Sequence, residues 1–237
     1  MISTIALVAL ATPLVAPTID DYIPKFRDAA FTMKVGQANF AELRKINKDF
    51  ADSYRFKTTD VKMKEPFKLR VEGKLDGSSI MYIINGKNKL VKVPRSKISF
   101  RDNVANSPGK IQTPLDFGLI TASIFDDFYR ASFVRNDRAT GDVVFDLTYE
   151  PRFKDNTRQR VFIEPTTKLL TKREWYNRKG DLMAIFTYGG AAKDSGSGVY
   201  FPTTLTVRNA DNKVAGTATY TDLKVNDGLS ESLFELK

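Results

Sequence analysis

The sequence predicts a mainly β protein with a few helices (α+β), folded as an incomplete antiparallel β-barrel whose helices form a lid over a hydrophobic cavity. Three observations indicate this fold. From Tyr54 onward, short runs rich in Val, Ile, Thr, Phe and Tyr are separated by turn residues, as in a meandering antiparallel sheet. Several runs carry apolar residues at every second position, which gives a sheet one apolar face. Two other stretches have apolar residues at helical spacing, which predicts amphipathic helices.

The first element is an uncharged, mostly apolar stretch from Met1 to Ala16. It is shorter than the roughly 20 apolar residues that a membrane-spanning helix needs. The triplet Ala9-Leu10-Ala11 resembles a signal cleavage site, although no Lys or Arg precedes the apolar run. We therefore expect residues 1–16 to be a signal peptide, residues 17–237 to form a single domain, and the protein to be periplasmic or otherwise exported.

Helices are expected at the start of this domain. Thr18 is a suitable N-cap, and Asp20 and Asp21 place carboxylates in the first turn. Residues 38–50 carry apolar side chains at helical spacing: Phe40, Leu43, Ile46 and Phe50. One or two amphipathic helices are predicted here.

The strands follow. The candidate runs are residues 54–64, 67–72, 79–85, 89–93, 143–150, 158–164, 169–177, 182–188, 200–208 and 214–225. Asp76-Gly77, Asn85-Gly86, Lys179-Gly180-Asp181 and Ala210-Asp211-Asn212 stand between runs, and these residue types favour the positive φ of hairpin turns.

A third helix is predicted between the strands, at residues 114–129. Thr113 can cap it, Pro114 suits its first position, and an apolar stripe follows: Leu115, Leu119, Ile120, Ile124, Phe125 and Phe128. A twisted sheet with one apolar face must be covered. Partial cover by helices would leave a cavity.

Two missing residue types restrict the chemistry. The chain has no Cys and no His, which excludes disulfides, thiolate nucleophiles, Ser-His or Cys-His catalysis and His or Cys metal ligands. The formal charge of +9 would attract acidic partners or anionic surfaces, but a solvated basic surface is the favoured interpretation. Lys and Arg are spread along the whole chain without a nucleic-acid motif, so no nucleic acid is expected as a partner.

Four segments, in this order, resemble bacterial outer-membrane lipoprotein-sorting proteins, the periplasmic LolA-like carriers. Residues 61–70 (VKMKEPFKLR) are similar to the strand-Pro-strand corner of that family, and residues 85–94 (NGKNKLVKVP) to one of its hairpins. Residues 162–177 (FIEPTTKLLTKREWYN) and 222–234 (DLKVNDGLSESLF) resemble two later segments. Residues 113–129 and 131–142 are closer to an uncharacterised bacterial branch of the same superfamily.

The resemblance implies a non-enzymatic carrier that binds lipid or lipoprotein acyl chains, with no cofactor, no metal and no catalytic residue. A membrane-bound donor or acceptor protein is the implied partner, and we expect a monomer. The residues that the resemblance implies for the cavity are Phe67, Leu69, Ile80, Tyr82, Leu119, Ile124, Phe128, Phe145, Leu147, Tyr149, Phe186 and Phe201.

Other interpretations stay open from the residues alone. Apolar stripes are more often packed core than ligand site. A ligand-responsive envelope sensor that binds a membrane protein is one alternative function, and a carboxylate-dependent polysaccharide hydrolase is a remote one. For the latter, Asp126-Asp127 are adjacent, and neighbouring helical residues point about 100° apart. Arg70, Arg173 and Arg178 can pair with lipid phosphates, but exposed strand charges are the default interpretation.

Overall fold

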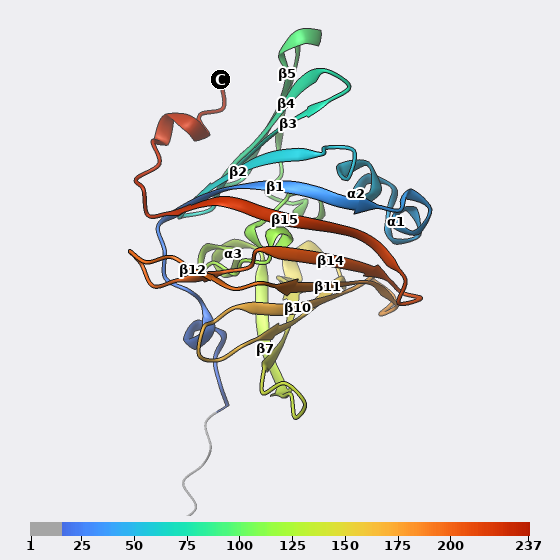
Figure 1. Cartoon of the computed structure of the whole chain (residues 1–237), viewed down its shortest axis with the longest axis vertical. Helices are drawn as coiled ribbons and strands as arrows, with labels where there is room; N and C mark the ends of the chain where they lie inside the picture. Colours follow the sequence, from blue (N-terminus) through green and yellow to red (C-terminus); the bar gives the residue numbers. More distant parts are fainter. Residues whose placement is uncertain (1–15) are drawn as a thin grey trace, which may run out of the picture.

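One large curved sheet dominates the computed structural model, which describes residues 16–237 (Figure 1). The predicted signal peptide, residues 1–16, lies outside the described residues except for Ala16. Within the described part, the sheet has 13 strands in the order β6-β5-β4-β3-β2-β1-β15-β14-β11-β10-β9-β8-β7. Neighbouring strands are antiparallel, and β6 and β7 form its two edges. The mainly β antiparallel prediction is confirmed, and the sheet is not a closed barrel.

The bounds of the strands are β1 Asp28–Ala38, β2 Thr58–Lys64, β3 Lys68–Leu75, β4 Ser78–Asn85, β5 Asn88–Val93, β6 Ile98–Asn103, β7 Tyr129–Asn136, β8 Val143–Tyr149, β9 Arg158–Ile163, β10 Leu170–Tyr176, β11 Leu182–Gly189, β14 Thr204–Asn209 and β15 Val214–Val225, with a separate small hairpin of β12 Ala192–Lys193 and β13 Tyr200–Phe201. The α-helices are α1 Phe40–Ile46, α2 Lys48–Ser53 and α3 Ser123–Asp127. The 3-10 helices are η1 Ile19–Tyr22, η2 Pro94–Ser96, η3 Pro108–Lys110, η4 Pro114–Phe117, η5 Pro151–Phe153 and η6 Glu231–Phe234.

The hairpins form where the turn residues predict them. Every predicted strand run overlaps a strand of the structure. Asp76 and Gly77 join β3 to β4 with φ of 49° and 77°, and Gly180 joins β10 to β11 with φ of 88°. Glycine adopts such angles without the steric cost of a Cβ atom, so these turns are specified locally.

The predicted helical opening of the domain is only partly correct. Asn39 and Asn47 cap α1 and α2 with their side chains, close to the predicted residues 38–50. Thr18 precedes only one 3-10 turn, η1. Strand β1 was not predicted, and it pairs with β2 and with β15 at the far end of the chain. This non-local pairing overrides the helical propensity of Ala, Met and Gln in β1.

The single helix predicted at residues 114–129 is wrong. Its start is correct, since Pro114 opens η4 and Thr113 forms a capping box with Asp116. The turn ends at Gly118, which has φ of 80°, and only the short α3 follows before β7 begins at Tyr129. Residues 98–103 and 129–136, the two edge strands, were not predicted either.

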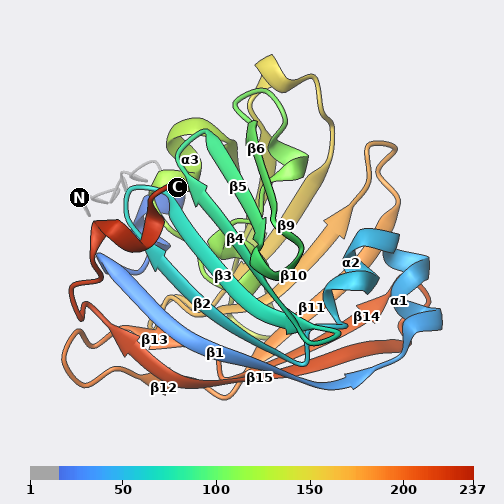
Figure 2. The same ribbon diagram turned by 90° about the horizontal axis from the view of Figure 1, so that it is seen from above.

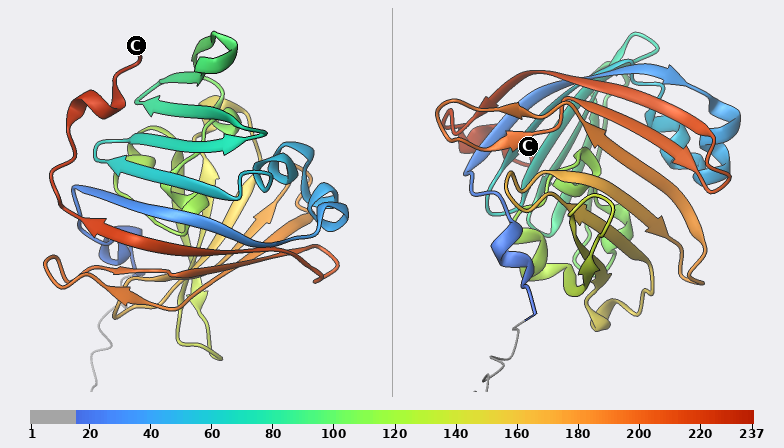
Figure 3. Two further views of the ribbon diagram at one scale, coloured as in Figure 1. Left: turned by 45° about the horizontal axis from the view of Figure 1, so that its top comes forward. Right: turned by 60° about the horizontal axis from the view of Figure 1, so that its bottom comes forward.

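The chain between β6 and β7 lies on the concave side of the sheet (Figure 2). Leu115, Phe117, Ile124 and Phe128 of this segment are buried in the same core as the sheet. The Phe117 ring lies 5.8 Å from that of Phe31 on β1. Helices α1 and α2 lie at one end of the curved sheet (Figure 3).

Candidate functional site

A cavity of about 690 Å³ lies on the concave side of the sheet. The sheet supplies one wall, α2 and the following residues supply a second, and residues 109–117 supply a third. The backbone N–H of Gln112 donates to the Tyr82 hydroxyl at 3.0 Å, which fixes the third wall to β4. The size falls within the range of roughly 300–1,000 Å³ that is typical of small-molecule sites.

Four of the predicted cavity residues line this space: Ile80, Tyr82, Tyr149 and Phe186. They come from β4, β8 and β11, so the fold brings distant parts of the chain together. The other eight are buried in the core and do not line it: Phe67, Leu69, Leu119, Ile124, Phe128, Phe145, Leu147 and Phe201.

Contacts between distant segments bury several of these eight residues. The ring of Phe67 lies 5.0 Å from that of Phe128, so two predicted ligand contacts face each other. Tyr22 of η1 packs 5.7 Å from Phe145. These contacts are made by segments far apart in the sequence, and alternation within one strand does not indicate them.

Much of the lining was not predicted from the sequence. Apolar wall residues also come from β1, β3, β14, β15 and the end of α2: Met33, Val35, Val71, Leu205, Ala218, Phe50 and Tyr54. Val71 and Leu205 stand at alternating apolar positions of the predicted runs 67–72 and 200–208, so their orientation was available from alternation. The contribution of β1 to the wall could not be predicted, because the strand itself was not predicted.

The cavity wall also contains a buried positive charge. Arg173 of β10 is 5% exposed, contrary to the expectation of an exposed strand charge. One terminal nitrogen donates to Oδ1 of Asp116 at 3.2 Å, and its Cζ lies 3.8 Å from the centre of the Phe186 ring. Burial acts to lower the pKa of Arg173, but Tyr188 and Asp116 outweigh it and raise the pKa, so the guanidinium is charged.

Arg70 and Arg178 do not line the cavity. Arg70 donates to the Leu233 carbonyl at 2.8 Å and to Glu72 at 2.6 Å. The Arg178 side chain is 73% exposed and pairs with Asp155 at 2.7 Å. Of the three arginines considered for lipid phosphates, Arg173 is the one placed at the cavity.

The tyrosines of the wall are protonated at neutral pH. Burial raises the pKa of Tyr54, Tyr82, Tyr129 and Tyr149 above the ordinary phenol value. Their hydroxyls therefore act as neutral hydrogen-bonding groups.

One lining carboxylate, Asp155, does not have the raised pKa of a general acid. Burial acts to raise the pKa of Asp155, but hydrogen bonds from Arg178 and Thr157 outweigh it and lower the pKa. A general acid needs a raised pKa instead. Among residues 16–237, no cluster of three or more carboxylates has the arrangement of a metal site.

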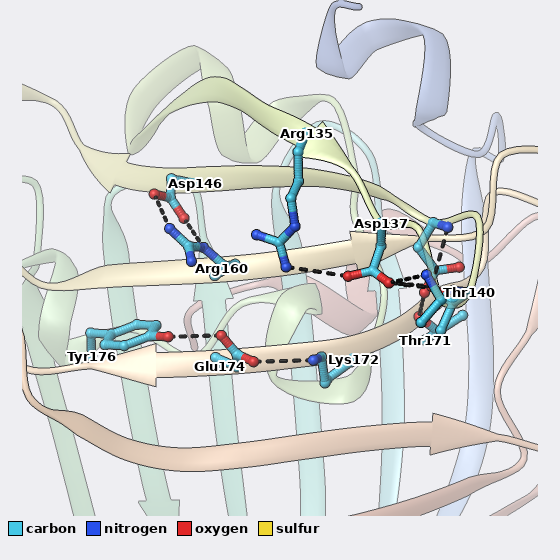
Figure 4. A network of polar contacts seen from close by, with 11 residues as sticks. Arg135, Asp137, Thr140, Asp146, Arg160, Thr171, Lys172, Glu174 and Tyr176 are labelled. Atoms are coloured by element: carbon cyan, nitrogen blue, oxygen red, sulfur yellow. Dashed lines mark hydrogen bonds and ion pairs between the residues drawn. The ribbon is translucent and has the colours of Figure 1, made fainter.

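The opposite, convex face of β8, β9 and β10 carries a network of paired polar side chains (Figure 4). Asp146 accepts hydrogen bonds from Arg160 at 2.8 Å and 3.0 Å. On β10, Glu174 pairs with Lys172 at 3.1 Å and accepts from the Tyr176 hydroxyl at 2.7 Å. The charges of these strands thus pair on the convex face, while Arg173 is on the concave one.

A second cavity, of about 500 Å³, lies beside the N-terminal segment. Residues 23–27, Glu65, Thr121 and Asn226 contribute to its lining. It contains none of the predicted ligand contacts.

No helix within residues 16–237 is long and apolar enough to cross a membrane.

Solved structures share this fold. A protein from Vibrio parahaemolyticus, described as an outer membrane lipoprotein-sorting protein domain, is 15% identical, with a TM-score of 0.61 over 91% of this chain and 92% of that one. A LolA superfamily protein from Nitrosomonas europaea is 15% identical, with a TM-score of 0.57 over 91% and 93%. A DUF1329 family protein from Desulfovibrio piger is 13% identical, with a TM-score of 0.55 over 93% and 98%. The predicted resemblance is confirmed for the fold.

Sequence comparison adds the family. No curated protein matches the chain significantly. A family model described as an uncharacterized protein matches residues 118–237, which is half of the chain. The chain belongs to this family, and it has the fold of the LolA superfamily.

Proposed function

We propose that the protein is a non-enzymatic carrier that binds the acyl chains of a lipid or a lipoprotein in the cavity on the concave side of its sheet. The observation that carries the proposal is that cavity, with its volume of about 690 Å³ and its largely apolar wall. Each buried CH₂ group contributes about 0.8 kcal/mol to binding, so an acyl chain needs no other specific contact. Ile80, Tyr82, Tyr149 and Phe186 are the proposed contacts among the predicted residues, and the other eight form the packed layer behind the wall.

The cover of the cavity is proposed to act as a lid. The ring centre of Phe50 on α2 lies 5.7 Å from that of Phe186 on the sheet, and residues 109–117 close the opposite side. Movement of these segments would open the cavity. Cargo contacts would shift the equilibrium between open and closed states. A membrane-bound donor would supply the cargo, or a membrane-bound acceptor would receive it.

Export and a single domain are part of the proposal. The fold shared with an outer membrane lipoprotein-sorting domain and a LolA superfamily protein supports an exported location, periplasmic in a bacterium with two membranes. The continuous sheet, in which β1 of the first half pairs with β15 of the second, supports one domain over residues 17–237.

Two measurements test the carrier proposal. Protein purified from an envelope fraction should release acyl-containing molecules that mass spectrometry identifies. Delipidated protein should bind a fluorescent acyl probe saturably, and Trp175, the single Trp, lines the cavity and can report binding. Absence of both co-purified lipid and saturable binding would refute the proposal.

One observation favours a second candidate, an envelope sensor that binds a membrane protein. Ile98 and Phe100 on edge strand β6 are 53% and 52% exposed. An unpaired strand edge can accept a strand from another protein. Recovery of one stable protein partner without lipid, lost on Phe100→Lys, would favour this candidate over the carrier.

A further inference from the structure

The strand register places an arginine and a glutamine at diagonal positions on neighbouring strands of the cavity wall. Arg173 on β10 lies between Val161 of β9 and Phe186 of β11. Two residues further along β10, Trp175 faces the same side, with Gln159 of β9 opposite it. Arg173, Trp175 and Gln159 all line the cavity. A charged group and an amide thus lie diagonally across from each other in the register, in a wall whose other charged side chains are Asp49, Lys89, Lys110, Asp116 and Asp155.

The hydrogen-bonding capacity of these two groups is not met by the protein. A guanidinium has five N–H donors, and Arg173 donates to Asp116 through one terminal nitrogen. Its Nε is buried without an acceptor, and the Oε1 of Gln159 is buried without a donor. A buried charge or polar atom without its hydrogen bonds is unfavourable, so a ligand that supplies them would be stabilised.

Asp116 compensates the charge of Arg173 only in part. Its Oδ2 also accepts the backbone N–H of Thr113 at 2.9 Å, and its side chain is 39% exposed. The pair is joined by a single bond of 3.2 Å and lacks the two parallel bonds of a bidentate arginine–carboxylate pair. The guanidinium can therefore donate hydrogen bonds to a second anion.

We infer that the cavity binds an acyl-chain amphiphile head-first, with an anionic carboxylate or phosphate group on Arg173 and the acyl tail along the apolar part of the wall. This inference rests on the proposed carrier function and narrows its ligand class. The planar guanidinium fork matches both head groups. Met33, Val71, Ile80 and Leu205 provide the surface for the tail.

The test compares ligands with the same tail and different heads: hexadecanoate, hexadecyl phosphate and hexadecanol, each displacing a fluorescent acyl probe from the full-length protein. An additional hydrogen bond to a charged group predicts that hexadecanoate or hexadecyl phosphate binds at least about tenfold more tightly than hexadecanol. The order of the two anions identifies which head group the site prefers.

Arg173→Gln should abolish the preference for the anion, measured as the ratio of the anion and hexadecanol affinities within that variant, because the three ligands share the same tail. Lys172→Gln is the matched control. It removes the same charge from the next residue of β10, whose side chain pairs with Glu174 on the convex face. This control should keep the full preference.

A second variant tests the inference if Arg173→Gln does not fold. Asp116→Asn removes the competing carboxylate and should tighten binding of the anionic ligands several-fold relative to hexadecanol. If the Arg173–Asp116 pair only holds residues 113–118 to the sheet, this variant should weaken all three ligands equally, and that result would overturn the inference.

The outcomes separate the inference from the proposed function. Equal affinity for hexadecanol and both anions in the unmodified protein would overturn the inference and leave the carrier proposal standing. If folded Arg173→Gln still binds the anions more tightly than hexadecanol, the inference is also overturned and the carrier proposal still stands. If none of the three ligands binds, the carrier proposal itself fails.

Discussion

Substitution of Gly118 by alanine tests how tightly the segment between β6 and β7 is fitted to the sheet. Gly118 ends η4 with φ of 80°. A Cβ atom at this position would lie 2.5 Å from Cδ1 and 2.6 Å from Cε1 of Tyr188 on β11. The Tyr188 hydroxyl donates to the Leu115 carbonyl at 3.4 Å, so the ring is held at both ends and cannot move away freely.

Three contributions set the magnitude. The left-handed conformation costs an alanine about 1–2 kcal/mol. Forcing a methyl group into a packed contact adds about 1–3 kcal/mol. The lower entropy of the unfolded alanine chain offsets about 0.4–1 kcal/mol of this. For Gly118→Ala we therefore expect a loss of about 2–4 kcal/mol in the free energy of unfolding.

Urea denaturation followed by circular dichroism measures the loss. Gly180→Ala is the control, because Gly180 has φ of 88° and an added Cβ atom would meet no other atom within 4 Å. Gly180→Ala has the backbone strain of a left-handed alanine without the Cβ contact, so it should lose only about 1 kcal/mol in the free energy of unfolding. Equal losses in the two variants would refute the close fit of Gly118 against Tyr188.

Three further predictions concern the core, the cavity and the convex face. Phe145→Ala should destabilise the fold by about 3–5 kcal/mol in urea denaturation. It should leave acyl-probe affinity unchanged, since Phe145 is buried behind the wall. A loss of affinity without a loss of stability would contradict this placement. Val71→Trp should fill the cavity and weaken acyl-probe binding about tenfold, because excluding two CH₂ groups costs about 1.6 kcal/mol, with an unchanged far-ultraviolet spectrum. Burial acts to raise the pKa of Asp146, but Arg160 and Arg158 outweigh it and lower the pKa. The stabilisation is therefore present above the ordinary carboxyl pKa and disappears as the pH falls through the lowered folded value. Asp146→Asn should cost about 1–2 kcal/mol at neutral pH, and this difference should shrink below about pH 4; a difference that is constant with pH would contradict the ion pair.

The hairpins were predictable because their determinants are local. Gly77 and Gly180 specify turns within a few residues, and alternation identifies the buried positions of β8, where Phe145 and Leu147 are inside and Asp146 faces outward. Local patterns did not predict β1. That strand is stabilised by pairing with β15, and no local pattern records a partner at the opposite end of the chain.

In the cavity, too, local sequence patterns predicted some features and missed others. Phe145 and Phe186 both occupy inward positions in alternating strands, and the sequence does not distinguish them. Phe145 is covered by Tyr22 and Phe133, whereas Phe186 faces the cavity beside Arg173. The difference comes from η1 and an edge strand, which reach the concave side only in the folded chain.

By itself, the sequence determined a mainly β chain of antiparallel hairpins with one apolar face, without the Cys and His side chains used in most redox and metal chemistry. Turn residues and period-two alternation act over a few residues, so these features can be predicted directly. The tertiary structure decided which apolar residues form core and which line the cavity, and it placed the charge of Arg173 inside. These properties depend on which distant segments cover each part of the concave face, and burial of a side chain is a property of all its neighbours together.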